Sequence, residues 1–523
     1  MGIGIDFGTT RTVVAYADRG NYPIVSFETD SGDMLEWFPS VVAEREGELL
    51  FGHAALAVLG DASFTQARSF KRLLSGAEAS ADGTVTIGSS RVLVADLVGR
   101  FLDALAEALR TRSNLPDNLK SRARLSAVVA TPANAFCTQR FITLDAFRRA
   151  GFDVQAMLNE PSAAGFEYSH RHARTLTSKR EHVIVYDLGG GTFDASLVRM
   201  SGTQHDVVLT AGLAELGGDD FDRLMAEMIA KRAGLDFATL SPRPRALLLD
   251  QCRDAKERIN ASSRKVTIDA SESLAQYTDE PELTLALADY YEACTPLVER
   301  TLGAMQEVLA RRAGEGERDE QELMADVAGV YVVGGASALP VVARVLRARF
   351  GKRVHRSPYP HAAVAIGLAI ASDADAGFGL GDRFSRNFGV FREAQGGQKA
   401  SYDVIFTRDV ALPRPGEPSV SVERRYRAAH DVGHYRFFEC AAFDAEGMPR
   451  GDIAPLTDML FPFDARLRSG ADLRRLPVKR LDREGPLVAE RYAVDAHGMV
   501  EVTITDLDSG FERRHQLGAT ATA

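Results

Sequence analysis

Cysteine and tryptophan are scarce in this chain of 523 residues, which holds four cysteines and one tryptophan. The cysteines are Cys137, Cys252, Cys294 and Cys440, and no two of them have the Cys-x-x-Cys spacing of a zinc site or a redox motif. This spacing therefore predicts neither a disulfide framework nor a metal centre, and it is typical of proteins from a reducing compartment.

Long hydrophobic runs and an excess of positive charge are also missing. The longest uncharged stretches, around 327–343 and 357–372, contain glycine or proline and are shorter than the ~20 apolar residues of a membrane-spanning helix. The N-terminus, Met-Gly-Ile-Gly-Ile-Asp, lacks the basic stretch of a secretory signal. A total of 62 Lys and Arg against 72 Asp and Glu gives a net charge of −10, which disfavours non-specific binding to nucleic acid or to an anionic membrane. We therefore expect a cytoplasmic protein with neither kind of partner.

The remaining composition is that of a globular protein, with 45% hydrophobic and 26% charged residues. Its length corresponds to three or four domains or lobes at about 150 residues each. Hydrophobic periodicity predicts helices over 96–112, 138–150, 219–233, 243–261 and 286–313, and strands over 125–131, 206–211, 265–269 and 329–333. This alternation predicts an α/β fold up to about residue 375. Short alternating segments from residue 402 onward, such as 420–423 and 500–505, predict a mostly β domain at the C-terminal end.

A strand–turn–strand unit occurs twice. Residues 3–16 place a Gly8-Thr9-Thr10 turn between two apolar strands, and residues 183–198 repeat the plan around Gly189-Gly190-Gly191-Thr192. An aspartate precedes each turn, and Asp6 and Asp187 are 187 − 6 = 181 residues apart. Such a duplication predicts two facing lobes. The backbone N–H groups of a small-residue turn can bind phosphate oxygens, and a rigidly held aspartate can orient water on Mg²⁺.

The two turn motifs resemble the phosphate motifs of the 70-kilodalton heat-shock chaperones, the DnaK-like family, within the actin-like ATPase superfamily. Three further motifs match this family: Asn-Glu-Pro-Ser-Ala-Ala at 159–164, Gly-Gly-Asp-Asp-Phe-Asp at 217–222 and Val-Val-Gly-Gly-Ala-Ser at 332–337. The resemblance implies a two-lobed ATPase with ribonuclease H-like duplicated lobes over residues 1–375. Lobe I would span about 1–177 and 361–375, and lobe II about 178–360.

The resemblance extends to the C-terminal part, because residues 492–506 are similar to a strand–turn–strand of the family's peptide-binding β domain. It implies a linker at 376–389, a β-rich substrate-binding-like domain at 390–518 and a frayed tail at 519–523. The strand pattern runs to about Leu517 and six residues follow it. We therefore expect a lidless variant, without the helical lid of the family.

The resemblance also implies ATP and Mg²⁺ as cofactors, and it assigns catalytic roles to five residues. Lys71 would reach the γ-phosphate and the attacking water, and Glu160 would orient the metal's water shell. Asp187 and Asp194 would position the attacking water or the waters of the metal, and Thr192 would orient water near the γ-phosphate. Asp6 and Asp187 would hold Mg²⁺ through water. The implied nucleotide-binding residues are Asp6, Gly8, Thr9, Thr10, Arg11, Gly189, Gly190, Gly191, Gly217, Gly218, Lys256, Asn260, Gly334, Gly335 and Ala336.

Several positions depart from the family pattern, mostly on the side of the base. Ala338 stands where the family usually has an arginine that packs on adenine, and Glu257 and Asn260 replace residues that commonly flank it. His361 replaces an aspartate, and the glycine-broken segment 378–382 replaces a leucine-rich linker. We therefore expect better binding of phosphate than of base.

The sequence thus predicts an ATP-hydrolysing, chaperone-like protein that couples its nucleotide state to binding of unfolded or extended polypeptide, with co-chaperones as further expected partners. In the family a valine-proline switch, which Thr131-Pro132 resembles, carries this coupling. The alternative is a nucleotide-binding actin-like scaffold with little hydrolysis, which recruits a specific partner through its β domain. A small-molecule kinase is disfavoured because the C-terminal domain resembles a peptide binder.

Overall fold

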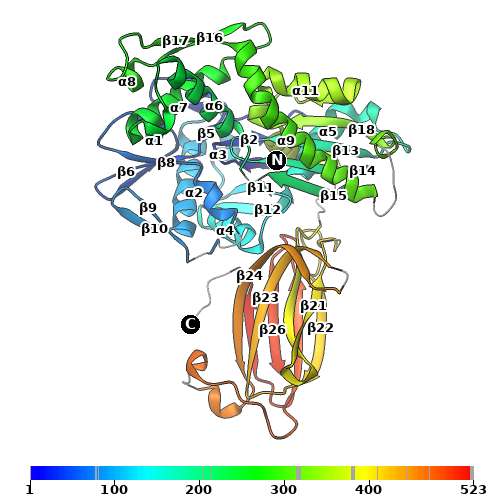
Figure 1. Cartoon of the computed structure of the whole chain (residues 1–523). Coiled ribbons are helices and arrows are strands. Elements are labelled where there is room, and N and C mark those ends of the chain that lie inside the picture. The colour runs from blue at the N-terminus through cyan, green and yellow to red at the C-terminus, as the bar shows by residue number, and fades with distance from the viewer. Residues whose placement is uncertain are drawn as a thin grey trace.

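The computed structural model describes residues 2–518 except 77–78, 81, 203, 214, 314–319, 378–382, 409, 445 and 470–471. The centre of the expected linker and the expected frayed tail at 519–523 lie outside the described residues. Figure 1 shows an upper part built of sheets and helices and a lower part built of long strands. The predicted fold class, α/β followed by a mostly β domain, is confirmed.

The first lobe is built on a five-stranded sheet in the order β12-β11-β1-β2-β5. These strands are β1 (Ile3–Phe7), β2 (Arg11–Tyr16), β5 (Phe38–Pro39), β11 (Leu125–Thr131) and β12 (Phe152–Asn159). The central β1 pairs antiparallel with β2 and parallel with β11. Helices α2 (Val94–Thr111) and α4 (Cys137–Arg149) pack against each other on this lobe. We call residues 2–177, together with helix α12 (Ala363–Ala371), lobe I.

The second lobe, residues 182–356, repeats this plan. Its sheet runs β15-β14-β13-β18-β19, and the central β13 pairs antiparallel with β14 and parallel with β18. The duplication expected from the two turns is therefore confirmed. The strands are β13 (His182–Leu188), β14 (Phe193–Ser201), β15 (Gln204–Leu213), β18 (Val327–Val333) and β19 (Val354–Arg356). The main helices of lobe II are α6 (Gly218–Arg232), α7 (Pro242–Glu257), α9 (Leu287–Ala313) and α11 (Pro340–Phe350).

Two helices join the lobes at their base. Helix α5 (Glu160–His172) packs on β13, β14 and β15, and α12 packs on β1, β2 and α5. Every residue of α12 is buried, as expected of a helix that is apolar on all sides. Gly367 lets the two helices approach closely, because a Cβ there would lie 1.8 Å from the Ala163 carbonyl oxygen. Residues of both lobes and of these two helices therefore belong to one hydrophobic cluster.

The predicted elements of these lobes agree with the observed ones within two residues, with one exception. The helix predicted over 243–261 ends at Glu257. Beyond it, the Asn260 side chain accepts a hydrogen bond from the backbone N–H of Ser262 at 3.0 Å. A short polar side chain that bonds to the nearby backbone in this way favours a turn over a further helical turn. No helix among the described residues is long and apolar enough to span a membrane.

The β domain is a sandwich of two four-stranded sheets, β21-β20-β23-β24 and β22-β25-β26-β27. Its strands are β20 (Asn387–Ala394), β21 (Lys399–Phe406), β22 (Val420–Arg427), β23 (Val432–Phe443), β24 (Pro449–Pro462), β25 (Leu487–Val494), β26 (Val500–Asp506) and β27 (Glu512–Gln516). The first strand begins three residues before the start at 390 expected from the sequence. Apolar residues of both sheets fill the core between them, among them Phe388, Phe437, Tyr492 and Ile504.

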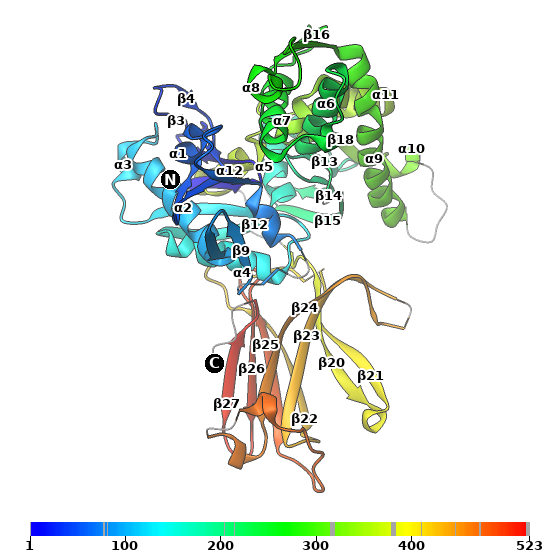
Figure 2. The ribbon, with the colours of Figure 1, turned by 60° about the vertical axis from the view of Figure 1, so that its left-hand side comes forward.

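The β domain lies directly below α4 of lobe I (Figure 2). The buried Arg140 of α4 donates to the His497 carbonyl oxygen of the β domain at 2.8 Å and to Thr131 Oγ1 of lobe I at 2.8 Å. The N–H of Cys137, the first residue of α4, donates to Glu439 Oε1 of β23 at 3.0 Å. Burial raises the pKa of Glu439 to about 7. These contacts fasten the N-terminal turn of α4 to the β domain.

Candidate functional site

A cavity of about 710 Å³ lies between the two lobes. This volume is in the range of sites that hold small molecules or cofactors. The turns Gly8-Thr9-Thr10 and Gly189-Gly190 enter it from opposite lobes. The other expected site residues that line it are Asp6, Arg11, Lys71, Glu160, Asp187, Thr192, Asp194, Gly218, Lys256, Gly334, Gly335 and Ala336.

Lys71 and Glu160 form an ion pair in this cavity, with Nζ 3.1 Å from Oε1. Lys71 belongs to the short 3₁₀ helix η1 (Phe70–Leu74), which Phe70 anchors in the core of lobe I. Its ammonium also lies 5.4 Å from the centre of the Phe7 ring. Glu160 is the first residue of α5. The pair therefore brings a side chain of η1 against the start of the helix that joins the lobes.

Three aspartates share the electrostatic field of this pair. Burial and the charge of Glu160 raise the pKa of Asp6 and of Asp194 to about 7, although Lys71 opposes the rise. The same causes, together with the charges of Asp194 and Asp6, raise the pKa of Asp187 well above its usual value. Carboxylates that repel one another in a buried site favour binding of a proton or a cation. The cluster therefore has the electrostatics of a cation site.

Magnesium fits this cluster if it is held through water. Among the described residues, no group of three or more His, Cys, Asp or Glu side chains is arranged to hold a metal ion directly. Mg²⁺ keeps several of its waters and needs few protein carboxylates. The raised pKa values of Asp6 and Asp187 show two carboxyl groups that a hydrated divalent cation would stabilise in the ionised form.

Close backbone packing fixes the second turn. The N–H groups of Gly218 and Asp219, at the start of α6, donate to the carbonyl oxygens of Gly189 at 2.9 Å and of Gly190 at 2.7 Å. Gly217 does not line the cavity but packs on this turn, where a Cβ would lie 2.6 Å from Gly191 backbone atoms. Gly191 is also outside the cavity lining, and its carbonyl oxygen accepts from Arg72 Nη2 at 2.8 Å. Both glycines therefore support the turn and do not face the cavity.

The wall expected to hold the base combines charged and apolar side chains. Lys256 Nζ lies 2.6 Å from Asp222 Oδ1 and donates to the Gly218 carbonyl oxygen at 3.0 Å, so the lysine is held by α6. Ala338 and Ile259 line the cavity, whereas Asn260 is exposed and does not. Asn260 is therefore placed away from the site that its sequence position implied.

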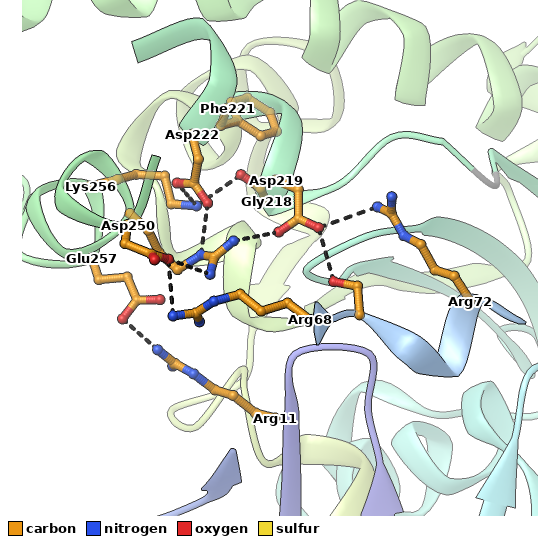
Figure 3. Close-up of polar contacts among 12 residues, drawn as sticks. Arg11, Arg68, Arg72, Gly218, Asp219, Phe221, Asp222, Asp250, Lys256 and Glu257 are labelled. Atoms are coloured by element: carbon orange, nitrogen blue, oxygen red, sulfur yellow. Dashed lines mark hydrogen bonds and ion pairs between the residues drawn. The ribbon is translucent and has the colours of Figure 1, made fainter. Parts of the chain in front are cut away.

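Ion pairs cross the cleft between the lobes (Figure 3). Arg68 Nη2 of lobe I lies 3.0 Å from Asp250 Oδ1 of α7, and Arg72 Nη2 lies 3.4 Å from Asp219 Oδ2 of α6. Arg253 of α7 then links Asp219, at 3.0 Å, with Asp250, at 3.4 Å. These ion pairs form one connected network that joins lobe I to α6 and α7 of lobe II.

Arg11 makes a further contact across the cleft. Its guanidinium lies 4.0 Å from the centre of the Trp37 ring and pairs with Glu257 at the end of α7. Trp37 in turn packs edge-on against His361, with ring centroids 6.5 Å apart. All four residues line the cavity. The indole of Trp37 in lobe I and the carboxylate of Glu257 in lobe II therefore hold the Arg11 side chain in place.

Sequence reasoning missed several residues of this network. Arg68, Asp250 and Arg253 lie outside every quoted motif, and alternating charges on a helix such as α7 are usually solvent-exposed. Asp219 and Asp222 stood inside the Gly-Gly-Asp-Asp-Phe-Asp motif without an assigned role. Asp219 and Asp222 carried a signal as part of that motif, but their partners come from η1 and α7.

The sequence of this chain is similar to those of known proteins. The family model described as "Hsp70 protein" matches residues 97–382, which is more than half of the chain. Similar relatives are the Chaperone protein HscA homologs of Burkholderia mallei (strain SAVP1), Burkholderia pseudomallei (strain 668) and Burkholderia multivorans. Each is 34% identical over 390 residues, which cover 72% of this chain and 59% of the relative. The chain thus matches about three fifths of the length of these relatives.

Proposed function

Because the chain belongs to the Hsp70 family, we propose that it is an ATP-hydrolysing chaperone that couples nucleotide state to the binding of unfolded or extended polypeptide. The relatives' printed name, Chaperone protein HscA homolog, supports this proposal. The observation that carries it is the Lys71–Glu160 pair in the lining of a cavity that two aspartate-led turns enter from opposite lobes.

The proposed catalytic groups are Lys71, Glu160, Asp187, Thr192 and Asp194. Lys71 would stabilise negative charge on a phosphoryl group, and its pairing with Glu160 supports this role because it holds the ammonium in position before the substrate arrives. Asp194, with its pKa raised to about 7, can accept a proton from an attacking water near neutral pH. Thr192 lines the same cavity and can orient that water. Phosphoryl transfer of this kind depends mainly on positioning and charge stabilisation.

ATP and Mg²⁺ are the proposed cofactors. The turn residues 8–10 and 189–190 would hold the phosphates through their backbone N–H groups. Asp6 and Asp187 would hold Mg²⁺ through water, and the bound ion would neutralise phosphate charge. Gly334, Gly335, Ala336 and Lys256 would contact the nucleoside.

The β domain is the proposed site for polypeptide clients, and co-chaperones are proposed partners. Contacts from Arg140 connect it to Thr131, the residue before Pro132 of the cavity lining. This chain of contacts supports coupling between the two parts. The four cysteines form no disulfide and are buried, which fits the expected cytoplasmic location. A scaffold with little hydrolysis is not favoured, because the charged groups that hydrolysis needs are present and paired.

Single-turnover hydrolysis of ATP, with and without an unfolded polypeptide, tests this proposal. We expect Mg²⁺-dependent release of phosphate that an unfolded, carboxymethylated protein accelerates and the same protein in its folded form does not. Nucleotide binding without turnover would favour the scaffold instead. If no polypeptide alters the rate of ATP turnover, the assignment as a chaperone is wrong and the assignment as an ATPase stands.

A further inference from the structure

An extended segment crosses the β domain at its end far from the lobes, after β24 (Figures 1 and 2). We call residues 476–484, Leu-Pro-Val-Lys-Arg-Leu-Asp-Arg-Glu, the strap. It runs from the 3₁₀ turn η9 (Leu473–Arg475) toward β25 and has no regular secondary structure apart from one bridge. Val478 is 48% and Leu476 36% exposed, so the strap adds little to the hydrophobic core. Polar contacts must hold it in place.

The strap pairs with the chain between β22 and β23 as an added strand would. His430 and Arg480 form an antiparallel bridge. The Asp431 N–H donates to the Lys479 carbonyl oxygen at 2.9 Å, and the Leu481 N–H donates to the Ala429 carbonyl oxygen at 2.9 Å. The Lys479 N–H donates in addition to Asp431 Oδ1 at 2.8 Å. An exposed backbone edge of this kind is a template for any extended segment that offers the same groups.

Charge complements the backbone pairing. Glu393, near the end of β20, accepts from Arg480 Nη1 at 2.9 Å and lies 3.4 Å from His430 Nε2. We call Glu393 together with residues 429–431 the receptor edge. It offers the carboxylate of Glu393 to the Arg480 side chain and the carboxylate of Asp431 to the backbone N–H of Lys479. The receptor edge therefore favours an extended backbone that carries a basic side chain opposite Glu393.

The strap is fixed at both ends and lightly held between them. Leu473 is buried before it, and Gly485 is buried after it, where a Cβ would lie 2.2 Å from the Ala428 carbonyl oxygen. Between these anchors the Arg480 side chain is 57% exposed, and ion pairs this exposed contribute little to stability. The strap can therefore leave the receptor edge without unfolding the sandwich.

We propose that the strap is an intramolecular occupant that blocks the receptor edge, and that an extended polypeptide segment with a basic residue at the position of Arg480 binds there when it displaces the strap. This rests on the proposed chaperone function. A client with this chemistry takes the place of the strap and makes the same backbone bonds to Ala429 and Asp431. Because the strap is tethered, it competes at an effective concentration of about millimolar, which lowers the apparent affinity for clients.

A labelled peptide with the sequence of residues 474–484 tests the proposal, with its binding to the full chain followed by fluorescence anisotropy. The strap-release variant combines Arg480→Glu, which opposes Glu393, with Leu481→Pro, which removes the N–H bonded to Ala429. We expect this variant to bind the peptide at least ~10-fold more tightly than the unaltered chain. Arg483→Glu makes the same charge change within the strap but outside the paired residues, and it should leave the affinity unchanged.

A charge exchange identifies the receptor edge itself. The exchange is made in a chain that carries Arg480→Ala with Leu481→Pro, because the acidic residue introduced at position 480 of the strap-release variant would attract a basic residue at position 393. Adding Glu393→Arg to this chain should abolish binding of the peptide. A peptide carrying Arg480→Glu should then bind to that variant and not to the same chain with Glu393 intact. This reciprocal result cannot arise from misfolding, because misfolding would not restore binding of the exchanged peptide.

Hydrogen exchange in the unaltered chain gives a readout without any variant. Saturating peptide should remove protection from the amides of Lys479 and Leu481 while that of Asp431 stays protected. Equal affinity of the unaltered chain and the strap-release variant, with no change in exchange, would overturn the proposal. If unfolded proteins stimulate ATP turnover but the peptide binds to neither form, the strap proposal fails and the chaperone function stands. If no polypeptide binds or stimulates, both fail.

Discussion

Lys71 Nζ lies 3.1 Å from Glu160 Oε1, and this contact joins the short helix η1 of lobe I to the first residue of α5, which packs on the sheet of lobe II. The Lys71 side chain is 8% exposed, so it has lost most of its contact with solvent before any ligand enters. A charge held in this way needs little reorganisation when a phosphoryl group arrives.

Replacement of Lys71 by alanine should lower ATP turnover by about 10²- to 10³-fold, which corresponds to about 2.7–4 kcal/mol of transition-state stabilisation. The loss follows because the positioned charge disappears while the two phosphate turns stay in place. Binding of nucleotide, measured by calorimetry, should remain. Lys399→Ala, at an exposed position of β21, serves as the control. If Lys71→Ala and the unaltered protein turn over equally, Lys71 has no role in hydrolysis.

The pH profile of turnover should depend on Glu160. In the unaltered protein, Asp194 ionises with a pKa of about 7, so kcat/KM should rise as the pH increases through 7. Glu160→Gln removes a charge that raises this pKa, so the rise should move to lower pH. Glu107→Gln, a distant change of the same type on α2, should leave the profile in place. An unmoved profile in Glu160→Gln would show that the rate depends on another group.

The ion pairs across the cleft should slow nucleotide release. Arg68 and Asp250 are partly exposed, so their pair should contribute about 0.2–1 kcal/mol, or up to about fivefold in the dissociation rate of a fluorescent nucleotide. Arg68→Ala, Asp250→Ala and the double variant form a thermodynamic cycle measured by stopped flow. Non-additive acceleration is expected. Strict additivity would mean that the two side chains do not interact while nucleotide is bound.

Discrimination between bases should be modest. Ala338 lines the cavity but offers no planar cation to stack on a base. We expect ATP and GTP to bind within about tenfold of each other in calorimetry, and Ala338→Arg to tighten ATP by about 0.5–2 kcal/mol. Ala338→Leu controls for added volume alone. Strong selectivity for adenine in the unaltered chain would indicate that another residue, such as Arg11 on Trp37, supplies the stacking.

The junction between lobe I and the β domain should depend on Arg140. Arg140→Ala leaves the buried Thr131 Oγ1 and the partly buried His497 carbonyl oxygen without this donor, at a cost of about 2–3 kcal/mol. Thermal unfolding should then separate into two transitions, because the β domain would no longer be docked. Arg148→Ala, exposed on the same helix, should keep the profile of the unaltered chain. Unchanged cooperativity in Arg140→Ala would place the coupling at Glu439 and Cys137 instead.

The parts of the fold that depend on local sequence were predictable. Each glycine-threonine turn has small residues between two apolar strands, and this pattern located both hairpins. Apolar residues at four-residue spacing located α2. The end of α7 was not predicted. The Asn260 side chain accepts a hydrogen bond from the Ser262 N–H in a turn beyond the helix, and the hydrophobic periodicity of the sequence does not mark this end. Contacts such as Arg68–Asp250 join residues 250 − 68 = 182 positions apart. Charge pairing of this kind has no spacing rule, so only the three-dimensional arrangement of the lobes reveals it.

Because Trp37 lies in the cavity lining under Arg11, tryptophan fluorescence can report on events in the cavity. Trp37 is the single tryptophan of the sequence, so all indole emission of this protein originates at the cleft. Any event that moves Arg11, Glu257 or His361 changes the surroundings of that one fluorophore. Opening of the lobes, entry of nucleotide and release of product can therefore be timed in the unlabelled chain, without a probe attached near the site it reports on.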